Sequence, residues 1–246
     1  MGRPNPNWRR EPNEFIRASA QAYNQKHGLE RTIDDLYVAV DVNRARRIAD
    51  AYEALTLDDS SDPAVLSAYS QFEIEIERQW KYARMKMGMT LEPWTQKGQP
   101  YATNSTEMRS DVRRNRHLYF FQGGEPHPLL GEIDPATGLS MNDKFRAIHD
   151  LFGHAAEGYG FGPRGEENAW LKHSQMFSAT AQRALTTETR GQNAWVNYGA
   201  HNYDAAGNRL IIPLKDRPYA IQKIALLPPE FSDFRTILKA VRNLRS

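Results

Sequence analysis

The sequence predicts a mainly α protein, a single helical domain with a minor β-hairpin element. Two observations predict this class. Apolar residues recur at steps of three and four along most of the chain, and the alternation typical of a strand is confined to short segments. The hydrophobic fraction of 40% beside 25% charged residues is that of a globular protein with a real core. We expect residues 1–12, rich in Pro, Asn and Arg, to form a flexible arm, and residues 13–246 to form the domain.

The clearest helix is predicted over residues 62–87. Ser61 or Asp62 can accept the free N–H groups of its first turn, Pro63 suits the first helical position, and Gly88 can end the helix. The apolar stripe of this helix consists of Val65, Tyr69, Phe72, Ile76, Trp80, Ala83 and Met87. This segment should therefore supply one long wall of the core.

The remaining elements follow from weaker patterns of the same kind. Further helices are expected over residues 13–26, 45–55 after an Asn43 cap, 105–115, 141–157, 165–176, 178–191, 218–226 and 231–244. Residues 117–121 have strand character, the stretch from Pro93 to Pro100 reads as a loop, and residues 204–212 predict a small hairpin or edge strand.

The composition excludes several classes of protein. The 246 residues contain no cysteine, which excludes a disulfide scaffold, a thiolate metal site and a cysteine nucleophile. Lys and Arg number 32 against 30 Asp and Glu, so the arginine clusters at 44–47 and 113–116 predict solvated helix faces, and nucleic-acid binding is not favoured. The chain has neither an N-terminal apolar run nor a membrane-length apolar segment, so we expect a cytoplasmic protein with no membrane association.

The segment from Phe145 to His154 carries the strongest chemical signal. His149 shares a helical face with Phe145, and His154 follows five residues later. On an ideal helix five steps rotate about 500°, so the two imidazoles converge only if the helix ends or bulges between them, and Gly153 is a favourable place for that. Asp150 and His154, four residues apart, share a face without distortion. Two ligand pairs therefore remain open: His149 with His154, or Asp150 with one histidine.

Glu188 is the predicted third ligand. It continues an apolar helical stripe formed by Phe177, Ala181, Ala184 and Leu185. A carboxylate in such a position is costly unless it is paired or binds a cation. The competing interpretation is a buried ion pair with Arg146, Arg183 or Arg190. The sequence therefore predicts a metal site formed by His149, His154 and Glu188.

These residues resemble the iron site of the pterin-dependent aromatic amino-acid hydroxylases. The resemblance covers about residues 145–200. It consists of His-Asp-Leu-Phe-Gly-His at 149–154, of Glu188 34 residues later, and of Tyr198-Gly199-Ala200 beyond that glutamate. Asp150 stands where the family usually has Glu, and no segment is identified for a pterin or another organic cofactor. The resemblance implies Fe(II) at this site. The segment 192–198 is also similar to uncharacterised phage-encoded proteins.

A mononuclear non-haem Fe(II) enzyme of hydroxylase or oxygenase type is the expected function. Two histidines and one carboxylate leave metal positions open for O₂ and a small-molecule substrate. The same ligands, with Zn or Mn, would serve metal-assisted hydrolysis. Asp150 and Glu157 are the candidate catalytic groups, although an exposed position at a helix end is the favoured interpretation of Glu157 itself. Arg164 and Tyr198 are the candidate substrate-binding residues, and the glycine-rich segment 158–165 is expected to be a mobile loop beside the site.

Two alternatives stay open. The dipeptide His149-Asp150 resembles the centre of the HD-type metal-dependent phosphohydrolases, which would also need an upstream histidine and a downstream aspartate, here His117 and Asp204. In the other alternative, the protein is structural or associated with nucleic acid, and the His/Glu cluster is a buried polar network. Structural roles are expected for two further histidines, His127 and His173.

Overall fold

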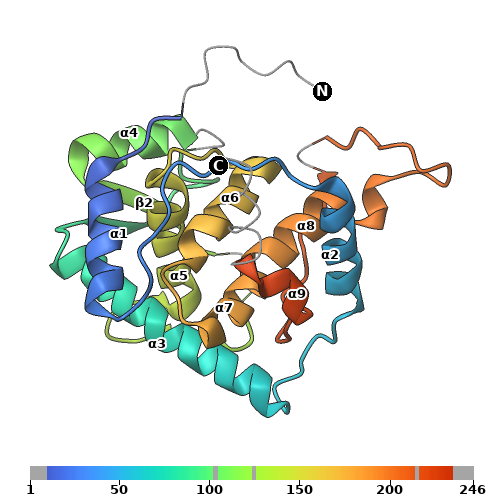
Figure 1. The fold of residues 1–246 in the computed structure, drawn as a ribbon, viewed down its shortest axis with the longest axis horizontal. Coiled ribbons are helices and arrows are strands. Elements are labelled where there is room, and N and C mark those ends of the chain that lie inside the picture. The colour runs from blue at the N-terminus through green and yellow to red at the C-terminus, as the bar shows by residue number, and fades with distance from the viewer. Residues whose placement is uncertain (1–9, 102–104, 124–125, 214–215, 235–246) are drawn as a thin grey trace.

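The protein is mainly α, as the sequence predicts (Figure 1). The computed structural model describes residues 10–101, 105–123, 126–213 and 216–234. In chain order the elements are α1 (Glu14–Lys26), α2 (Val42–Ala54), α3 (Pro63–Met85), β1 (Thr90–Trp94), α4 (Ser105–Asn115), β2 (His117–Phe121), β3 (Ile133–Asp134), β4 (Leu139–Ser140), α5 (Met141–His149), η1 (Asp150–Ala155), α6 (Pro163–Ser174), α7 (Ala179–Thr186), η2 (Thr187–Gly191), α8 (Gln192–Tyr198), η3 (Ala200–Asn202) and α9 (Pro229–Ser232). Within these described ranges, no helix is both long enough and apolar enough to cross a membrane.

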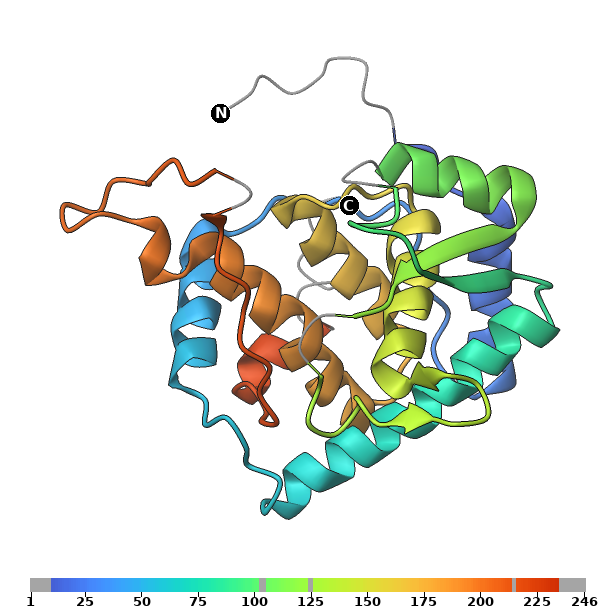
Figure 2. The same ribbon diagram turned by 180° about the vertical axis from the view of Figure 1, so that it is seen from behind.

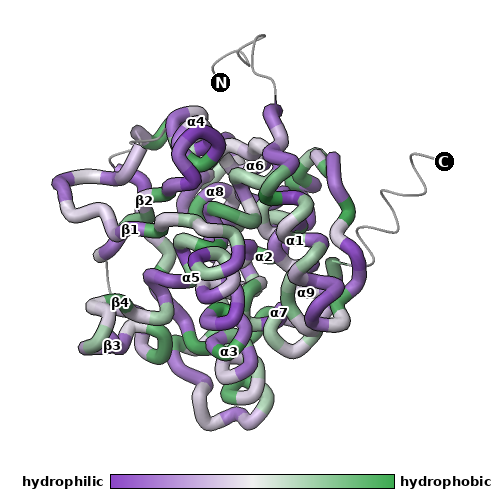
Figure 3. The backbone as a smooth tube through the Cα atoms, turned by 90° about the vertical axis from the view of Figure 1, so that its left-hand side faces the viewer, coloured by the Kyte–Doolittle hydropathy of each residue, from purple (hydrophilic) through white to green (hydrophobic). Residues whose placement is uncertain are grey.

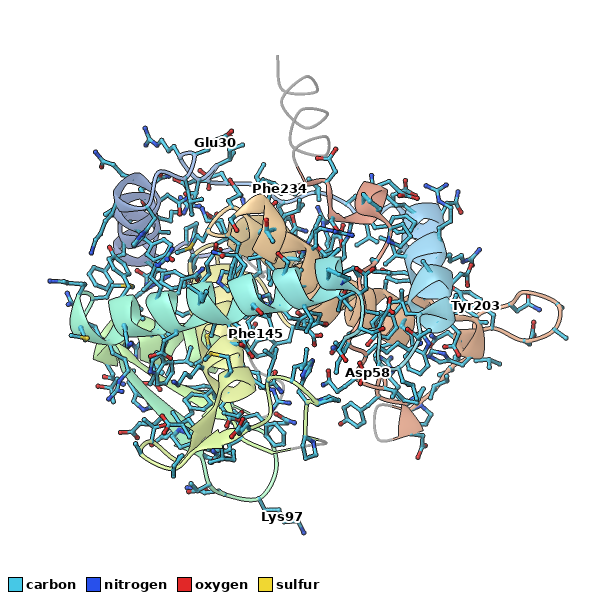
Figure 4. The ribbon with its side chains drawn as sticks, turned by 90° about the horizontal axis from the view of Figure 1, so that it is seen from below. Glu30, Asp58, Lys97, Phe145, Tyr203 and Phe234 are labelled. Carbon is cyan, nitrogen blue, oxygen red and sulfur yellow. The ribbon has the colours of Figure 1, made fainter. Side chains whose placement is uncertain are left out.

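The long helix α3 forms one wall of the core, as predicted from its stripe. The Asp62 side chain accepts the Ala64 N–H at 2.7 Å, with Pro63 in the first turn. Phe72 of α3 packs against Phe145 of α5 and Phe177, with ring centroids 5.0 and 5.4 Å apart. In Figure 4, α3 crosses the front of the molecule and Phe145 lies behind it. The predicted stripe is thus the surface on which α5 and α7 rest.

The helices are amphipathic, which explains why one side of each is buried. Figure 3 shows alternating hydrophobic and hydrophilic stretches along the helical segments. A second, smaller core cluster lies between α2, α8 and the C-terminal segment, and it contains Ile48, Ala49, Tyr52, Ala194, Leu227 and Phe231. The helix predicted over 45–55 is present, and Asp41 caps it instead of Asn43.

Short strands lie beside the helices, and three of them, β1, β3 and β4, were not expected. β1 pairs in parallel with β2, with Thr90 opposite His117. The sequence analysis read Pro93 as part of a loop, but Pro93 lies within β1. A two-stranded sheet leaves one edge of β1 without a ladder, so a missing N–H is tolerated there. From behind, this pair lies at the side of the molecule next to α4 (Figure 2).

The C-terminal third differs most from the prediction. The hairpin forms between β3 and β4, and in the predicted segment 204–212 only an isolated bridge joins Tyr203 to Arg209. Residues 218–226 are extended instead of helical. Ile224 forms an isolated bridge with Asp58, so the segment runs along α2 and the start of α3. Of the helix predicted over 231–244, the described part ends with α9 at Ser232, and residues 235–246 lie outside the described residues.

One face of α6 is bound to the connecting segment 28–41. Residues spaced by one helical turn each bond to this segment: Arg164 and Asn168 donate to the Val38 carbonyl, and Lys172 donates to Asp34. The opposite face of α6 carries Glu166 and His173, two turns apart. Bonds along the outer face therefore fix the rotation of α6 and, with it, the direction of both side chains.

Candidate metal centre

His149 and His154 converge because the helix changes its winding between them. α5 ends at His149, and residues Asp150–Ala155 form the π-helical turn η1. The Ala156 N–H donates to the Leu151 carbonyl, and the Tyr159 N–H donates to that of His154. Each of these bonds spans five residues, which brings positions five apart onto one face. The imidazole centroids lie 5.3 Å apart, so the structure has the predicted distortion and the first of the two open ligand pairs.

Glu166 completes the group. Within the described part of the chain, His149, His154 and Glu166 are the residues whose ligand atoms all lie within 4.8 Å of one another. The Glu166 Oε2 atom is 3.3 Å from His154 Nε2 and 3.9 Å from His149 Nε2. The His154 side chain is 1% exposed and that of Glu166 is 29% exposed, so the cluster is reached from the Glu166 side. Glu166 is not among the ligands that the sequence predicts.

The cluster is electrostatically coupled. Burial raises the pKa of Glu166, but the neighbouring His154 and His149 outweigh burial and lower this pKa to about 2. Burial lowers the pKa of His154, but Glu166, Asp150 and the Tyr159 backbone outweigh it, so the net shift is upward. A carboxylate held ionised beside buried imidazoles is an environment that favours a cation.

Dimensions and chemistry both fit a divalent metal. Metal–ligand bonds of about 2.1 Å at right angles place two ligand atoms about 3 Å apart. The separations of 3.3 and 3.9 Å therefore close with a movement of less than about 1 Å. Two imidazole nitrogens and one carboxylate oxygen suit Fe(II), Zn or Mn.

Glu188 is not a member of this group. Its Oε1 atom accepts hydrogen bonds from Tyr69 Oη at 2.5 Å and from His127 Nε2 at 3.1 Å, and its Oε2 atom accepts one from Gln192 at 2.9 Å. Sequence analysis identified a buried carboxylate that needs partners, and Glu188 is one. Its hydrogen-bond partners are neutral donors, and no ion pair joins it to the predicted arginines, although Arg146 interacts with it electrostatically.

His127 has a fixed tautomer. Its Nδ1 atom accepts hydrogen bonds from the backbone N–H groups of Leu129 and Leu130, at 3.1 and 2.9 Å. The ring proton is therefore on Nε2, from which it is donated to Glu188. This agrees with the structural role expected for a turn histidine.

Asp150, a predicted catalytic residue, lies beside the cluster. Its carboxylate interacts electrostatically with His154, His149, Glu166 and Arg146, and burial raises its pKa. No hydrogen bond or ion pair joins it to the residues that the structure describes. Asp150 thus offers a half-buried carboxylate within electrostatic reach of the cluster, and no described residue forms a hydrogen bond with it.

Glu157 is bound elsewhere. The alternative of an exposed helix end is wrong, because Glu157 is 0% exposed. Its carboxylate lies 2.5 Å from Arg17 and 2.7 Å from Lys172, and the Asp35 N–H donates to it at 3.1 Å. These contacts join α1, α6 and the 28–41 segment around one buried charge. Glu157 is thus held by structural contacts and is not a member of the His149, His154 and Glu166 group.

The two predicted substrate-binding residues have other contacts. Arg164 donates to the backbone carbonyls of Tyr37 and Val38, both at 2.9 Å, and its guanidinium lies 3.8 Å from the centroid of the Tyr37 ring. Tyr198 lines a surface cavity together with Arg46, Asp50, Ala200, Tyr203 and Gly207. None of the three ligand residues lines that cavity. Tyr203 lies near the base of the projecting loop (Figure 4).

The residues required by an HD-type site are not in the cluster either. His117 bonds to Asp111 at 2.6 Å and lies 3.5 Å from Glu92. Asp204 organises an exposed turn by accepting from the backbone of Ala206 and Asn208. Both candidates therefore serve local structure.

Gly153 and the following loop shape the site. A Cβ at Gly153 would lie 3.2 Å from Ala169 and 3.3 Å from His149 Cε1, so the absence of a side chain lets η1 approach α6. The Phe161 ring lies 5.1 Å from that of His154 and covers it. The glycine thus serves close packing, whereas the sequence analysis attributed it to backbone freedom.

A feature of the sequence could have identified Glu166. It shares a helical face with Trp170 and His173, at i+4 and i+7, so it is an acidic residue on an inner stripe, as Glu188 is. Comparison of the chain with protein-family models, with curated proteins and with solved structures finds no match. The cluster of His149, His154 and Glu166 is therefore the observation from which function must be inferred.

Proposed function

We propose that this chain is a metal-dependent enzyme that holds one divalent transition metal through His149, His154 and Glu166. The observation that carries the proposal is the convergence of two imidazole nitrogens and one carboxylate oxygen within 4.8 Å in a largely buried cluster. Atoms with lone pairs that face one another are stabilised by a cation between them. Iron(II) oxygenase or hydroxylase chemistry is the favoured reaction type.

The ligand set supports this reaction type. When bound, iron(II) in a site of two histidines and one carboxylate supplies open positions where O₂ and a substrate meet. Glu166 contributes a negative charge at the exposed side of the cluster, and Phe161 keeps water from the ring of His154. Asp150 lies where it can accept a proton or a hydrogen bond from a bound group.

Metal-assisted hydrolysis is the second candidate, and Asp150 is the observation that favours it. Asp150 has no hydrogen-bond partner among the residues that the structure describes, and a carboxylate beside a bound metal would be available as a general base toward a water molecule. In that case Zn or Mn would replace iron. The substrate remains a small molecule in either case, because the cluster is buried.

The test is metal content followed by reactivity. Purified protein is reconstituted anaerobically with Fe²⁺, Zn²⁺ or Mn²⁺ in turn, and bound metal is measured for the wild type, for His154→Ala and for a control, His201→Ala, whose ring packs on Trp195 away from the cluster. We expect about one iron per chain in the wild type and control, and loss in His154→Ala. Oxygen uptake by the iron form supports the first reaction type, and hydrolysis of phosphate esters by the Zn or Mn form supports the second. A wild type that retains none of the three metals would refute the proposal.

A further inference from the structure

A buried contact between two histidines lies directly behind the metal cluster. His149 Nδ1 lies 3.2 Å from His173 Nδ1, and both rings are largely or wholly buried. Two imidazole nitrogens can form a hydrogen bond only when one of them carries a proton. The direction of this bond therefore determines which nitrogen of His149 has a free lone pair.

Gln79 determines that direction. The Gln79 Nε2 atom lies 3.0 Å from the Met176 carbonyl oxygen, which can only accept, so the amide nitrogen must face it. The Gln79 Oε1 atom consequently faces His173, at 2.8 Å from Nε2. An amide oxygen can only accept, so the proton of His173 is on Nε2.

The surroundings of His173 leave room for that one proton only. The ring is 0% exposed and lies among the rings of Phe145, Phe152 and Phe177, with centroids 6.4, 6.1 and 4.9 Å away. A second proton would place a positive charge in an apolar environment in which no described carboxylate contacts the ring, and this is costly. His173 Nδ1 is therefore an acceptor, and His149 Nδ1 donates to it.

We infer that Gln79 and His173 are positioning residues that fix His149 in the tautomer with its Nε2 lone pair directed at the metal. The inference rests on the proposed function. The chain of bonds runs from the Met176 carbonyl through Gln79 and His173 to His149, and it joins α3 and α6 to the end of α5. Partners of this kind behind a ligand histidine contribute about 10–100-fold to metal affinity.

Matched substitutions of His173 separate this role from packing. His173→Phe keeps a ring among the surrounding phenylalanines but removes the acceptor. His173→Asn is smaller, yet its Oδ1 atom takes the place of Nδ1 and can accept from His149. Gln79→Leu removes the acceptor one step further away. The control is His27→Phe, because His27 packs on Tyr23 and has no contact with the cluster.

Co²⁺ is the probe, and its dissociation constant is measured by visible absorption for each variant. We expect about 10–100-fold weaker binding in His173→Phe and Gln79→Leu, and a change of less than about threefold in His173→Asn and in the control. Equal losses in the Phe and Asn variants would assign His173 to packing and overturn the inference. Thermal unfolding of each metal-free variant verifies that it is folded.

Nitrogen NMR of the imidazoles in the metal-free wild type tests the same inference without any metal. We expect the proton of His149 on Nδ1 and that of His173 on Nε2, and the reverse pair would overturn the inference. The two proposals fail differently. A wild type that binds no Co²⁺ contradicts the proposed metal function, whereas normal Co²⁺ binding in both the wild type and His173→Phe contradicts only the role of His173.

Discussion

Two carboxylates at inner helical positions, Glu166 with a side chain 29% exposed and Glu188 with one 3% exposed, have opposite surroundings. Each lies on the inner face of a helical segment and next to a histidine. Glu188 receives hydrogen bonds from Tyr69, His127 and Gln192. Glu166 instead faces Nε2 of both His149 and His154. Glu188 has its acceptor capacity filled by donors, whereas Glu166 shares its space with two imidazole nitrogens.

The tautomers of the neighbouring histidines produce this difference. Two backbone N–H groups hold Nδ1 of His127, so its Nε2–H is left for Glu188. In the inferred arrangement, His173 Nδ1 accepts a hydrogen bond from Nδ1–H of His149, so the Nε2 lone pair of His149 is left for the side of Glu166. An acidic residue on an inner helical face therefore predicts a polar cluster. The contact of the neighbouring histidine's Nδ1 then determines whether its Nε2 donates to the carboxylate or presents a lone pair that a cation can bind.

The largest expected effect is the loss of metal on substitution of Glu166. Glu166→Ala removes one of three ligands and the only formal negative charge among them, so we expect Co²⁺ affinity to fall at least about 100-fold, more than for the loss of an outer partner. The measurement is the same absorption titration, with Glu188→Ala as the matched control. If Glu188→Ala abolished binding and Glu166→Ala did not, the assignment of the two carboxylates would have to be exchanged.

Glu188→Ala should act on stability instead. It leaves the Nε2–H of His127 without its acceptor in a buried space, and it removes one of two acceptors from Tyr69 and from Gln192, which keep the Lys223 carbonyl and Gln222. Because an unsatisfied buried donor costs about 1–3 kcal/mol, we expect a loss of roughly 2–4 kcal/mol in the free energy of unfolding, measured by urea denaturation of the metal-free protein. Tyr69→Phe removes a single donor and should cost about 1 kcal/mol. A loss below about 1 kcal/mol in Glu188→Ala would contradict the role given to this cluster.

Much of the fold could be predicted because local signals agree with the tertiary structure. α3 has a cap, a proline at the first position and a continuous stripe, and its bounds were predicted to within two residues. β1 was missed because Pro93 indicates a loop when the edge position of the strand is unknown. Residues 218–226 have a helical pattern, but their pairing with Asp58 depends on a distant part of the chain.

The same limit applies to the site. His149 and His154 are close in sequence, so their spacing alone predicts the distortion that the π-helical turn provides. The third ligand comes from another helix, and several acidic residues meet the criterion of an inner position. Glu166 and Glu188 cannot be distinguished until the packing of α6 against η1 is known. Arg164 contacts the 28–41 segment and Glu157 contacts α1. No local pattern in the sequence indicates either contact.

A smaller effect is expected from Gly153→Ala, which tests whether the metal cluster depends on close packing. The added Cβ would lie 3.2–3.3 Å from Ala169 and His149, so the ring or α6 must move by a few tenths of an ångström. We expect a cost of about 1–2 kcal/mol in stability and weaker Co²⁺ binding. Gly162→Ala is the control, because a Cβ there meets nothing within 4 Å. Unchanged Co²⁺ affinity in Gly153→Ala would show that the position of His149 tolerates this displacement.

The smallest effect concerns pH and separates the two carboxylates without removing a ligand histidine. In the metal-free protein the net pKa shift of His154 is upward, against burial and because of Glu166, Asp150 and the Tyr159 backbone. A raised pKa in the folded state stabilises the fold below the ordinary pKa, and this stabilisation is lost as pH rises through the folded pKa. Between about pH 6 and 9 we therefore expect metal-free wild type to lose about 1 kcal/mol of the free energy of unfolding. This loss lowers its melting temperature by roughly 2–4 °C.

Glu166→Gln should reduce this fall, because the neutral amide no longer favours protonated His154, whereas Glu188→Gln should keep the wild-type slope. When the slopes of the two variants are subtracted, the contribution of groups that titrate elsewhere in the chain cancels. Saturating Zn²⁺ should reverse the slope, since ligand histidines bind metal only when unprotonated and metal stabilises the folded state by mass action. Identical slopes in metal-free wild type and Glu166→Gln would mean that Glu166 does not interact with His154, and the comparison on which the metal centre rests would fail.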